Sequence, residues 1–201
     1  NCLCGTSSHN MSSEKQFRNP TEYGAPKPET ATFTATGGAS AVISNKKSNI
    51  KIESATIGRI VDYNQKDALN MGAVMACAAA DTLKRHLDDL NRKEDYYDLI
   101  LTGDLGLYGR EILKEFMMKE HKINISCNYN DCGVMLYDLE EQKEVLAGGS
   151  GPVCSALVLY GFILNEMKKK NIPYVLHSVN MSVVKADKEI ADALEIEKGK
   201  N

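Results

Sequence analysis

The strongest constraint on the fold of this chain is a change of periodicity in its middle third. Between residues 70 and 91, apolar side chains recur every three or four positions, which predicts an amphipathic helix. Residues 98–102 then form a short apolar run that ends at Gly103 and Asp104, and residues 110–120 return to helical spacing. Because a buried strand between two helices is the repeating unit of α/β proteins, we expect an α/β fold.

Weaker patterns predict the remaining elements. They are a strand over residues 30–36 that Gly37 and Gly38 break, strands over 39–44 and 50–63, a helix over 153–170 and a strand over 174–179. Residues 1–5 resemble the end of a buried strand, which predicts sheet neighbours upstream. The polar residues from 6 to 29 are expected to form a long surface loop.

Composition narrows the function. The chain has 201 residues and a formal net charge of -3, without the clustered basic excess typical of nucleic-acid binders. Its most apolar stretch, residues 153–164, is shorter than the roughly 20 residues needed to span a bilayer. Six scattered cysteines without a signal peptide indicate a reducing cytoplasm, no disulfides and no zinc site, and no cofactor is predicted. Cys2 and Cys4, alternating along a strand, are expected on opposite faces.

The glycine-rich turn of residues 148–151 is the first candidate site. It precedes the helix predicted over 153–170, so the backbone N–H groups of Gly149 and Ser150 could hold a carboxylate or phosphate. A tight turn that needs glycine for positive φ is an equal alternative. Pro152 stands where a serine-hydrolase nucleophile elbow has its closing glycine, which disfavours that class.

Asp131 and Cys132 form a second candidate in a dense polar patch. An activated cysteine would be a nucleophile and the aspartate could bind a cation, whereas a turn with a buried thiol is the favoured alternative for Cys132. Asp104 follows a predicted strand, where α/β folds place ligands, and could equally cap the next helix.

The histidines divide into two pairs. His86 and His121 lie on charged parts of predicted helices and are expected to face solvent. His9, in a loop crowded with hydrogen-bonding side chains, is a candidate ligand-binding residue, and His177 is left unassigned.

A series of short motifs then points to one family. In order along the chain they are Thr6-Ser7-Ser8-His9-Asn10, Pro20-Thr21-Glu22-Tyr23-Gly24, Ser54-Ala55-Thr56-Ile57-Gly58-Arg59, Ala78-Ala79-Ala80-Asp81-Thr82, Thr102-Gly103-Asp104-Leu105-Gly106, Asp131-Cys132-Gly133 and Ala147-Gly148-Gly149-Ser150-Gly151. This pattern, over roughly residues 1–178, resembles the stage V sporulation protein AD family of endospore-forming bacteria. An ordered series of this length is far more specific than any single motif.

The resemblance implies a thiolase-like fold of two βαβαβαββ halves. Residues 1–46 would then be the last strands of the first half, residues 47–179 the second half, and residues 180–201 a divergent charged tail. The resemblance also implies binding of dipicolinic acid, together with calcium, for its uptake into the developing spore and a later part in germination. It further implies association with the other stage V sporulation A membrane proteins at the forespore or spore inner membrane, and a homodimer.

One departure separates this chain from condensing enzymes of the same fold. Their catalytic histidine and asparagine would correspond to positions near Asp104 and within residues 148–150, where this chain has neither residue type. Without an imidazole, condensation should be crippled while a ligand pocket would survive. We therefore expect a non-catalytic binder whose ligand-binding residues are Asp104, Asp131, Cys132, Gly149, Ser150 and His9. A thiolase-like acyltransferase or condensing enzyme and a purely structural subunit are the alternatives.

Overall fold

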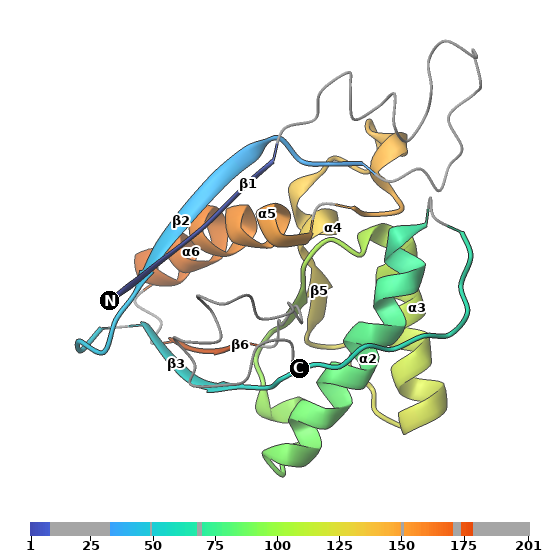
Figure 1. Cartoon of the computed structure of the whole chain (residues 1–201), viewed down its shortest axis with the longest axis horizontal. Coiled ribbons are helices and arrows are strands. Elements are labelled where there is room, and N and C mark those ends of the chain that lie inside the picture. Colours follow the sequence, from blue (N-terminus) through green and yellow to red (C-terminus); the bar gives the residue numbers. More distant parts are fainter. Residues whose placement is uncertain (9–32, 49, 68–69, 150, 171–173, 179–201) are drawn as a thin grey trace, which may run out of the picture.

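The chain folds into helices packed on short strands, a mixed α/β arrangement (Figure 1). The computed structural model describes residues 1–8, 33–48, 50–67, 70–149, 151–170 and 174–178. The strands are β1 (Cys2–Ser8), β2 (Gly37–Ile43), β3 (Ile50–Ala55), β4 (Ile100–Thr102), β5 (Tyr129–Asp131) and β6 (Tyr174–Ser178). The helices are α2 (Met71–Asp89), α3 (Gly106–His121), α4 (Cys132–Leu136), α5 (Gly151–Ala156) and α6 (Leu164–Lys169), with 3-10 turns at Glu94–Tyr96 and Lys143–Val145.

The described strands pair two by two. β1 and β2 form an antiparallel ribbon, whereas β3 pairs with β6 and β4 with β5 in parallel. Parallel pairs joined through helices confirm the α/β character predicted from the middle of the chain. The finer prediction of thiolase-like halves divided near residue 46 stays a prediction.

The first strands differ from their predicted limits. Gly37 and Gly38 do not break a strand but open β2, where they pair with Ser8 and Ser7. The ribbon packs on the helix beneath it so closely that a Cβ on Gly37 would come within 2.8 Å of the Leu157 side chain, so glycine suits this end of the strand (Figure 1). The strand predicted over 30–36 is wrong for its described part, because residues 33–36 form no regular element.

The thiols of Cys2 and Cys4 share one side of β1, with their Sγ atoms 3.7 Å apart. Opposite faces were the wrong prediction, since side chains two residues apart in a strand point the same way.

The strand predicted over residues 50–63 ends early, at Ala55. Beyond it the chain leaves the sheet and runs along α2, held by side-chain contacts. The Thr56 hydroxyl lies 2.7 Å from His86 Nδ1, and Arg59 forms an exposed ion pair with Asp81. Tertiary contacts with α2 therefore override the alternating pattern of this segment.

The predicted central helices are confirmed, and they cross at two glycines. A Cβ on Gly72 of α2 would overlap the carbonyl oxygen of Leu105, and one on Gly109 of α3 would lie 2.6 Å from the carbonyl oxygen of Gly72. Alanine, leucine, isoleucine, methionine and tyrosine side chains fill the rest of this core, including the fully buried Leu113 and Met117. The α2–α3 crossing thus depends on the absence of side chains at its closest point.

His86 is a core residue, which corrects the prediction that it faces solvent. Its side chain is 2% exposed, and its Nε2 lies 2.7 Å from the Tyr97 hydroxyl while Nδ1 contacts Thr56. His121 is half-buried and packs its ring near Phe116. The charged residues next to His86 in the sequence wrongly suggested an exposed helix face, because Thr56 and Tyr97, which cover His86, come from outside the helix.

The predicted third helix is confirmed as a continuous run from Gly151 to Lys169, but its centre, Leu157–Ile163, is π-helical. The side-chain amide of Asn165 donates to the carbonyl oxygens of Tyr160 and Gly161, at 3.2 and 2.9 Å, within this widened segment. The run lies under the β1–β2 ribbon and buries Cys154, Val158 and Ile163 (Figure 1).

The close contact between α2 and α3 predicts that an alanine at Gly109 destabilises the protein, whereas an alanine at the open position of Gly161 does not. Gly109→Ala should lower the free energy of unfolding by about 1–3 kcal/mol, because the added methyl group meets backbone. Gly161→Ala, where a Cβ would meet nothing within 4 Å, should leave stability unchanged or raise it by up to about 1 kcal/mol. Urea midpoints at constant m-value measure both, and equal midpoints for the two variants would contradict the crossing.

Candidate functional site

The candidate site lies at the carboxyl ends of two neighbouring parallel strands. β4 and β5 pair with Thr102 beside Asp131, their last residues. The 103–105 turn leads from β4 into α3, and α4 follows β5 directly. This sheet edge is where α/β proteins commonly bind ligands, and it contains the predicted residues Asp104, Asp131 and Cys132.

Asp131 holds this edge together. Its side chain is fully buried, and its two carboxylate oxygens accept five hydrogen bonds. The donors are the Thr102 hydroxyl at 2.6 Å and the backbone N–H groups of Leu105 at 3.0 Å, Gly106 at 3.1 Å, Gly133 at 2.9 Å and Val134 at 3.4 Å. One carboxylate therefore caps the amino-terminal ends of both α3 and α4, where N–H groups lack partners within the helix.

The charge state of Asp131 reflects two opposing effects. Burial raises the pKa of its carboxyl group and outweighs the hydrogen bonds from Thr102 and from the backbone of Leu105, Val134 and Gly133, which lower it. Since an ionised carboxylate is purely an acceptor, it matches a shell made only of donors. Its hydrogen-bonding capacity is used inside the protein, where it positions its neighbours, and its predicted contact with a ligand stays a prediction.

Asp104 lies against this anchored turn and is 5% exposed. Its backbone carbonyl accepts a hydrogen bond from the Gly149 N–H at 3.3 Å, and its carboxylate packs so closely on Gly133 that a Cβ there would overlap it. The alternative that Asp104 caps the next helix is wrong, because α3 has Leu105 at its N-cap position without a side-chain cap. The Asp131 carboxylate supplies that cap instead.

Cys132 and Cys154 are fully buried next to the two aspartates. Burial raises the pKa of both thiols, and the negative charges of Asp131 and Asp104 raise it further. Because the thiolate is the nucleophilic form, neither cysteine is set up to attack a substrate. The buried-thiol alternative for Cys132 fits this geometry.

The glycine-rich turn forms the third side of the site. Gly148 and Gly149 both have positive φ, at 74° and 143°. Their N–H groups donate within the protein, to the carbonyl oxygens of Val145 and Asp104, and the Gly148 carbonyl accepts from the Phe33 N–H at 3.0 Å. Within the described residues, Gly148 and Gly149 therefore form a tight turn, as the alternative interpretation predicts. Their two amides connect the site to neighbouring segments.

Two predicted site residues, His9 and Ser150, lie outside the described residues. The histidines whose side chains are described lie far from the site. His86 and His121 are near the carboxyl ends of α2 and α3, whose amino-terminal ends pack on the site. At a rise of 1.5 Å per residue, each histidine lies about 20 Å from the amino-terminal end of its helix. Neither the His86 imidazole nor the His121 imidazole therefore serves Asp104 or Cys132.

Some residues of the site were missed by the sequence analysis. Thr102 donates to Asp131 and lies 2.8 Å from the hydroxyl of Tyr129, which is itself buried, and Gly133 makes room for Asp104. Thr102 could have been noticed because it ends a predicted strand. Its contact with Asp131 could not be predicted, because Asp131 lies 29 positions further along the chain.

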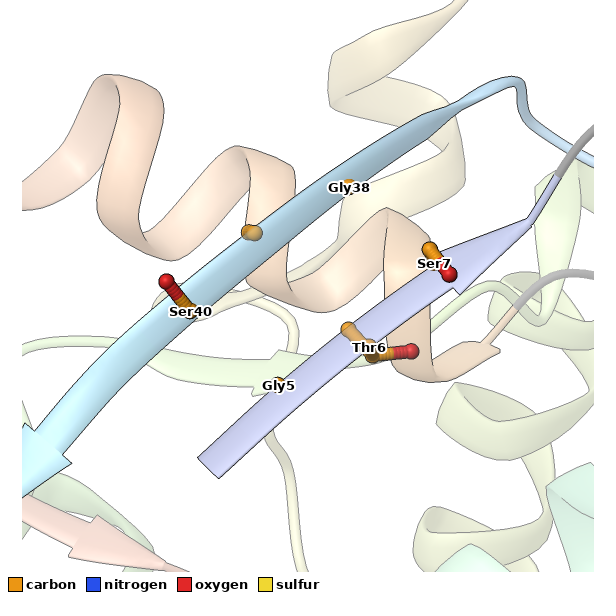
Figure 2. A pocket seen from close by; sticks show the side chains of 6 residues that line it. Gly5, Thr6, Ser7, Gly38 and Ser40 are labelled. Atoms are coloured by element: carbon orange, nitrogen blue, oxygen red, sulfur yellow. The ribbon is translucent and has the colours of Figure 1, made fainter. Parts of the chain in front are cut away.

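A shallow depression lies elsewhere, on the β1–β2 ribbon (Figure 2). The small residues Gly5, Thr6, Ser7, Gly38, Ala39 and Ser40 line it. It is open to solvent and includes neither a charged side chain nor any described residue of the predicted site, so it does not extend the site around Asp104.

Comparison with known proteins identifies relatives of this chain. Residues 1–185 match the sequence profile of the family described as Stage V sporulation protein AD. The chain is 48% identical over 167 residues to Stage V sporulation protein AD of Bacillus subtilis (strain 168), and the match covers 83% of this chain and 48% of that relative. The chain therefore spans about half the length of the curated relative it matches.

The anchoring role of Asp131 predicts a graded loss of stability. Asp131→Asn replaces an acceptor with a donor facing backbone N–H groups and should lower the free energy of unfolding by about 3 kcal/mol. Thr102→Val removes a single donor and should cost about 1 kcal/mol. Denaturant unfolding measures both, and an Asp131→Asn protein as stable as wild type would refute the anchor.

The burial of the thiols predicts their reactivity. At about pH 8, iodoacetamide should modify the exposed Cys127 rapidly, and should reach Cys132 and Cys154 only after denaturation. Peptide mass spectrometry over a time course resolves each position. Labelling of Cys132 at the rate of Cys127 would instead indicate an accessible, activated thiol.

Proposed function

Because this chain belongs to the stage V sporulation protein AD family, we propose that it is part of a protein that binds dipicolinic acid during spore formation. In this proposal the thiolase-like fold of the family supplies the scaffold. Residues 47–179 form its second half, with β1 and β2 as the last strands of the first. The rest of the ligand pocket belongs to the part of the family's protein that this chain does not span.

The observation that carries the proposal is the position of Asp104. It lies at the carboxyl end of β4, is almost completely buried, and packs on backbone at Gly133 and Gly149. A rigid edge of this kind supports binding without chemistry, since preorganised backbone needs little reordering when a small planar ligand arrives.

The charges of the site limit how a dianion binds there. Dipicolinate carries two carboxylates, and the carboxylates of Asp104 and Asp131 would repel them. A calcium ion between Asp104 and the ligand would resolve the repulsion, since calcium prefers carboxylate oxygens. A protonated Asp104, or a protein cation oriented by it, are the other two arrangements. The proposal favours calcium, because it uses the ion that accompanies dipicolinate in the family.

The second candidate function, acyl transfer, has less support. It requires an activated thiol and an imidazole or amide that stabilises the oxyanion. Burial and neighbouring carboxylates raise the pKa of the Cys132 and Cys154 thiols, and His86 and His121 lie at the far ends of α2 and α3. Acyl-coenzyme A turnover, or an acyl adduct on a cysteine of the full-length protein, would reverse this preference.

The proposal extends to the setting of the protein. We propose that it acts at the forespore or spore inner membrane with the other stage V sporulation A proteins, and as a homodimer. Within the described residues no helix has both the length and the apolar character to cross a membrane. Association through membrane partners is the form of attachment consistent with that finding.

Calorimetry of the full-length protein that contains this chain tests the function. Dipicolinate should bind in the presence of calcium, and Asp104→Asn should weaken binding at least about tenfold, or roughly 1.4 kcal/mol. Asp88→Asn on the exposed surface of α2 is the matched control and should bind as wild type does.

Repeating the calorimetry with and without calcium distinguishes the three arrangements proposed for Asp104. If Asp104 acts through calcium, its substitution should have little effect when a chelator is present. The function is wrong if neither heat nor a shift in thermal stability accompanies dipicolinate with or without calcium.

A further inference from the structure

A short segment before β2, residues 33–36, connects the β1–β2 ribbon to the site around Asp104. It forms no regular element, yet Thr34 and Ala35 are buried, at 7% and 5% exposed. The Ser8 hydroxyl at the end of β1 donates to the Ala35 carbonyl oxygen, which ties this end of the segment to the ribbon. These contacts lie inside the chain, so any further chain around the molecule adds to the burial of the segment.

Phe33 forms the other end of the segment and makes two contacts beside the site. Its backbone N–H donates to the Gly148 carbonyl oxygen at 3.0 Å. Its ring packs edge-to-face on the ring of Tyr137, the residue that ends α4, with centroids 6.4 Å apart and an interplanar angle of 88°. This is a favoured geometry for an aromatic pair. Phe33 therefore holds the glycine-rich turn through its backbone and the end of α4 through its side chain.

Both contacts of Phe33 lead directly to Asp104. Through the glycine-rich turn, the Gly149 N–H donates to the Asp104 carbonyl oxygen at 3.3 Å. Through α4, the Tyr137 N–H donates to the Gly133 carbonyl oxygen at 3.1 Å, and Gly133 packs on the Asp104 carboxylate. Phe33 is thus joined to one aspartate along two routes, which reach its carbonyl group and its carboxylate.

The glycine-rich turn is the part of the site that most needs such an outside contact. Gly148 and Gly149 have positive φ, at 74° and 143°, and glycine has more backbone freedom than any other residue. Because glycine has no side chain, contacts to its backbone decide which conformation is populated. A hydrogen bond from a segment that is itself buried restricts this freedom before a ligand arrives.

From these contacts we propose that Phe33 is a positioning residue of the ligand site, which fixes the glycine-rich turn and the end of α4 against Asp104 without touching the ligand. Its effect on affinity rests on the proposed binding function, whereas its effect on the turn does not depend on which ligand binds. The proposed function assigns β1 and β2 to the first half of the fold. Phe33 then makes the rigidity of a site in the second half depend on a segment of the first.

Hydrogen exchange of the Gly149 amide in the full-length protein that contains this chain tests the hold on the turn. Phe33→Ala removes the ring contact and should raise the exchange rate at least about tenfold, whereas Phe33→Tyr keeps the ring and should exchange as wild type does. Phe33→Leu disturbs the packing less and should raise the rate at least about threefold, so it serves if Phe33→Ala does not fold.

Tyr63→Ala is the matched control for these variants. It removes the ring of another edge-to-face pair, that of Tyr63 and Phe116, whose centroids are 5.7 Å apart at 87°. Phe116 lies in the later part of α3, away from the glycine-rich turn. Exchange of the Gly149 amide should therefore stay at the wild-type rate.

Calorimetry with dipicolinate and calcium measures the effect on the site. Phe33→Ala and Tyr137→Leu should each weaken binding at least about fivefold, and Phe33→Tyr should restore affinity to within about twofold of wild type. The double variant should lose less than the product of the two single losses, because both substitutions remove the same contact.

Two results would overturn the inference. One is wild-type exchange of the Gly149 amide in both Phe33→Ala and Phe33→Leu. The other is a pair of affinity losses, for Phe33→Ala and Tyr137→Leu, that multiply in full. Absence of dipicolinate binding by the wild-type protein contradicts the proposed function instead, and the exchange of Gly149 then decides the role of Phe33 alone.

Discussion

The buried carboxylate of Asp131 is the interaction on which the edge formed by β4, β5, α3 and α4 depends. Its donors come from the end of β4, from the start of α3 and from the start of α4. A single side chain thereby satisfies orphan N–H groups of two helices and sets the path of the turn that contains Asp104. The desolvation of a buried carboxylate is unfavourable, and this complete set of donors offsets it.

Glycine makes this arrangement possible in space. Side chains at Gly72, Gly106, Gly133 or Gly148 would overlap backbone or carboxylate atoms of the segments around Asp104. Gly106, Gly133 and Gly148 belong to three of the motifs that resemble the sporulation family, so these three motifs contain points where two segments approach closely. Their physical meaning is a rigid sheet edge, which supports the proposed binding role more readily than it supports catalysis.

The sequence predicted what depends on local periodicity. The helices α2 and α3, the strand β4 and the long helical run after Gly151 follow from apolar spacing. It failed where distant residues decide the outcome. His86 is buried because Thr56 and Tyr97 reach it from outside its helix, and the strand after Ala55 ends because its side chains bind α2.

The site shows the same division. The sequence placed Asp104 at a sheet edge and grouped it with Asp131 and Cys132 as ligand-binding residues, a role that stays a prediction, but it did not reveal what the Asp131 carboxylate contacts. The five donors that occupy this carboxylate lie up to 29 residues away in the chain, and only the paired ends of β4 and β5 bring them together.

Native-state hydrogen exchange of the Leu105, Gly106 and Gly133 amides examines the central claim most directly. If Asp131 anchors this edge, all three should exchange only through global unfolding, as slowly as the amides in the middle of α3. Exchange at the rate of an exposed loop would mean that the carboxylate does not hold these groups and that the site around Asp104 lacks its proposed rigidity.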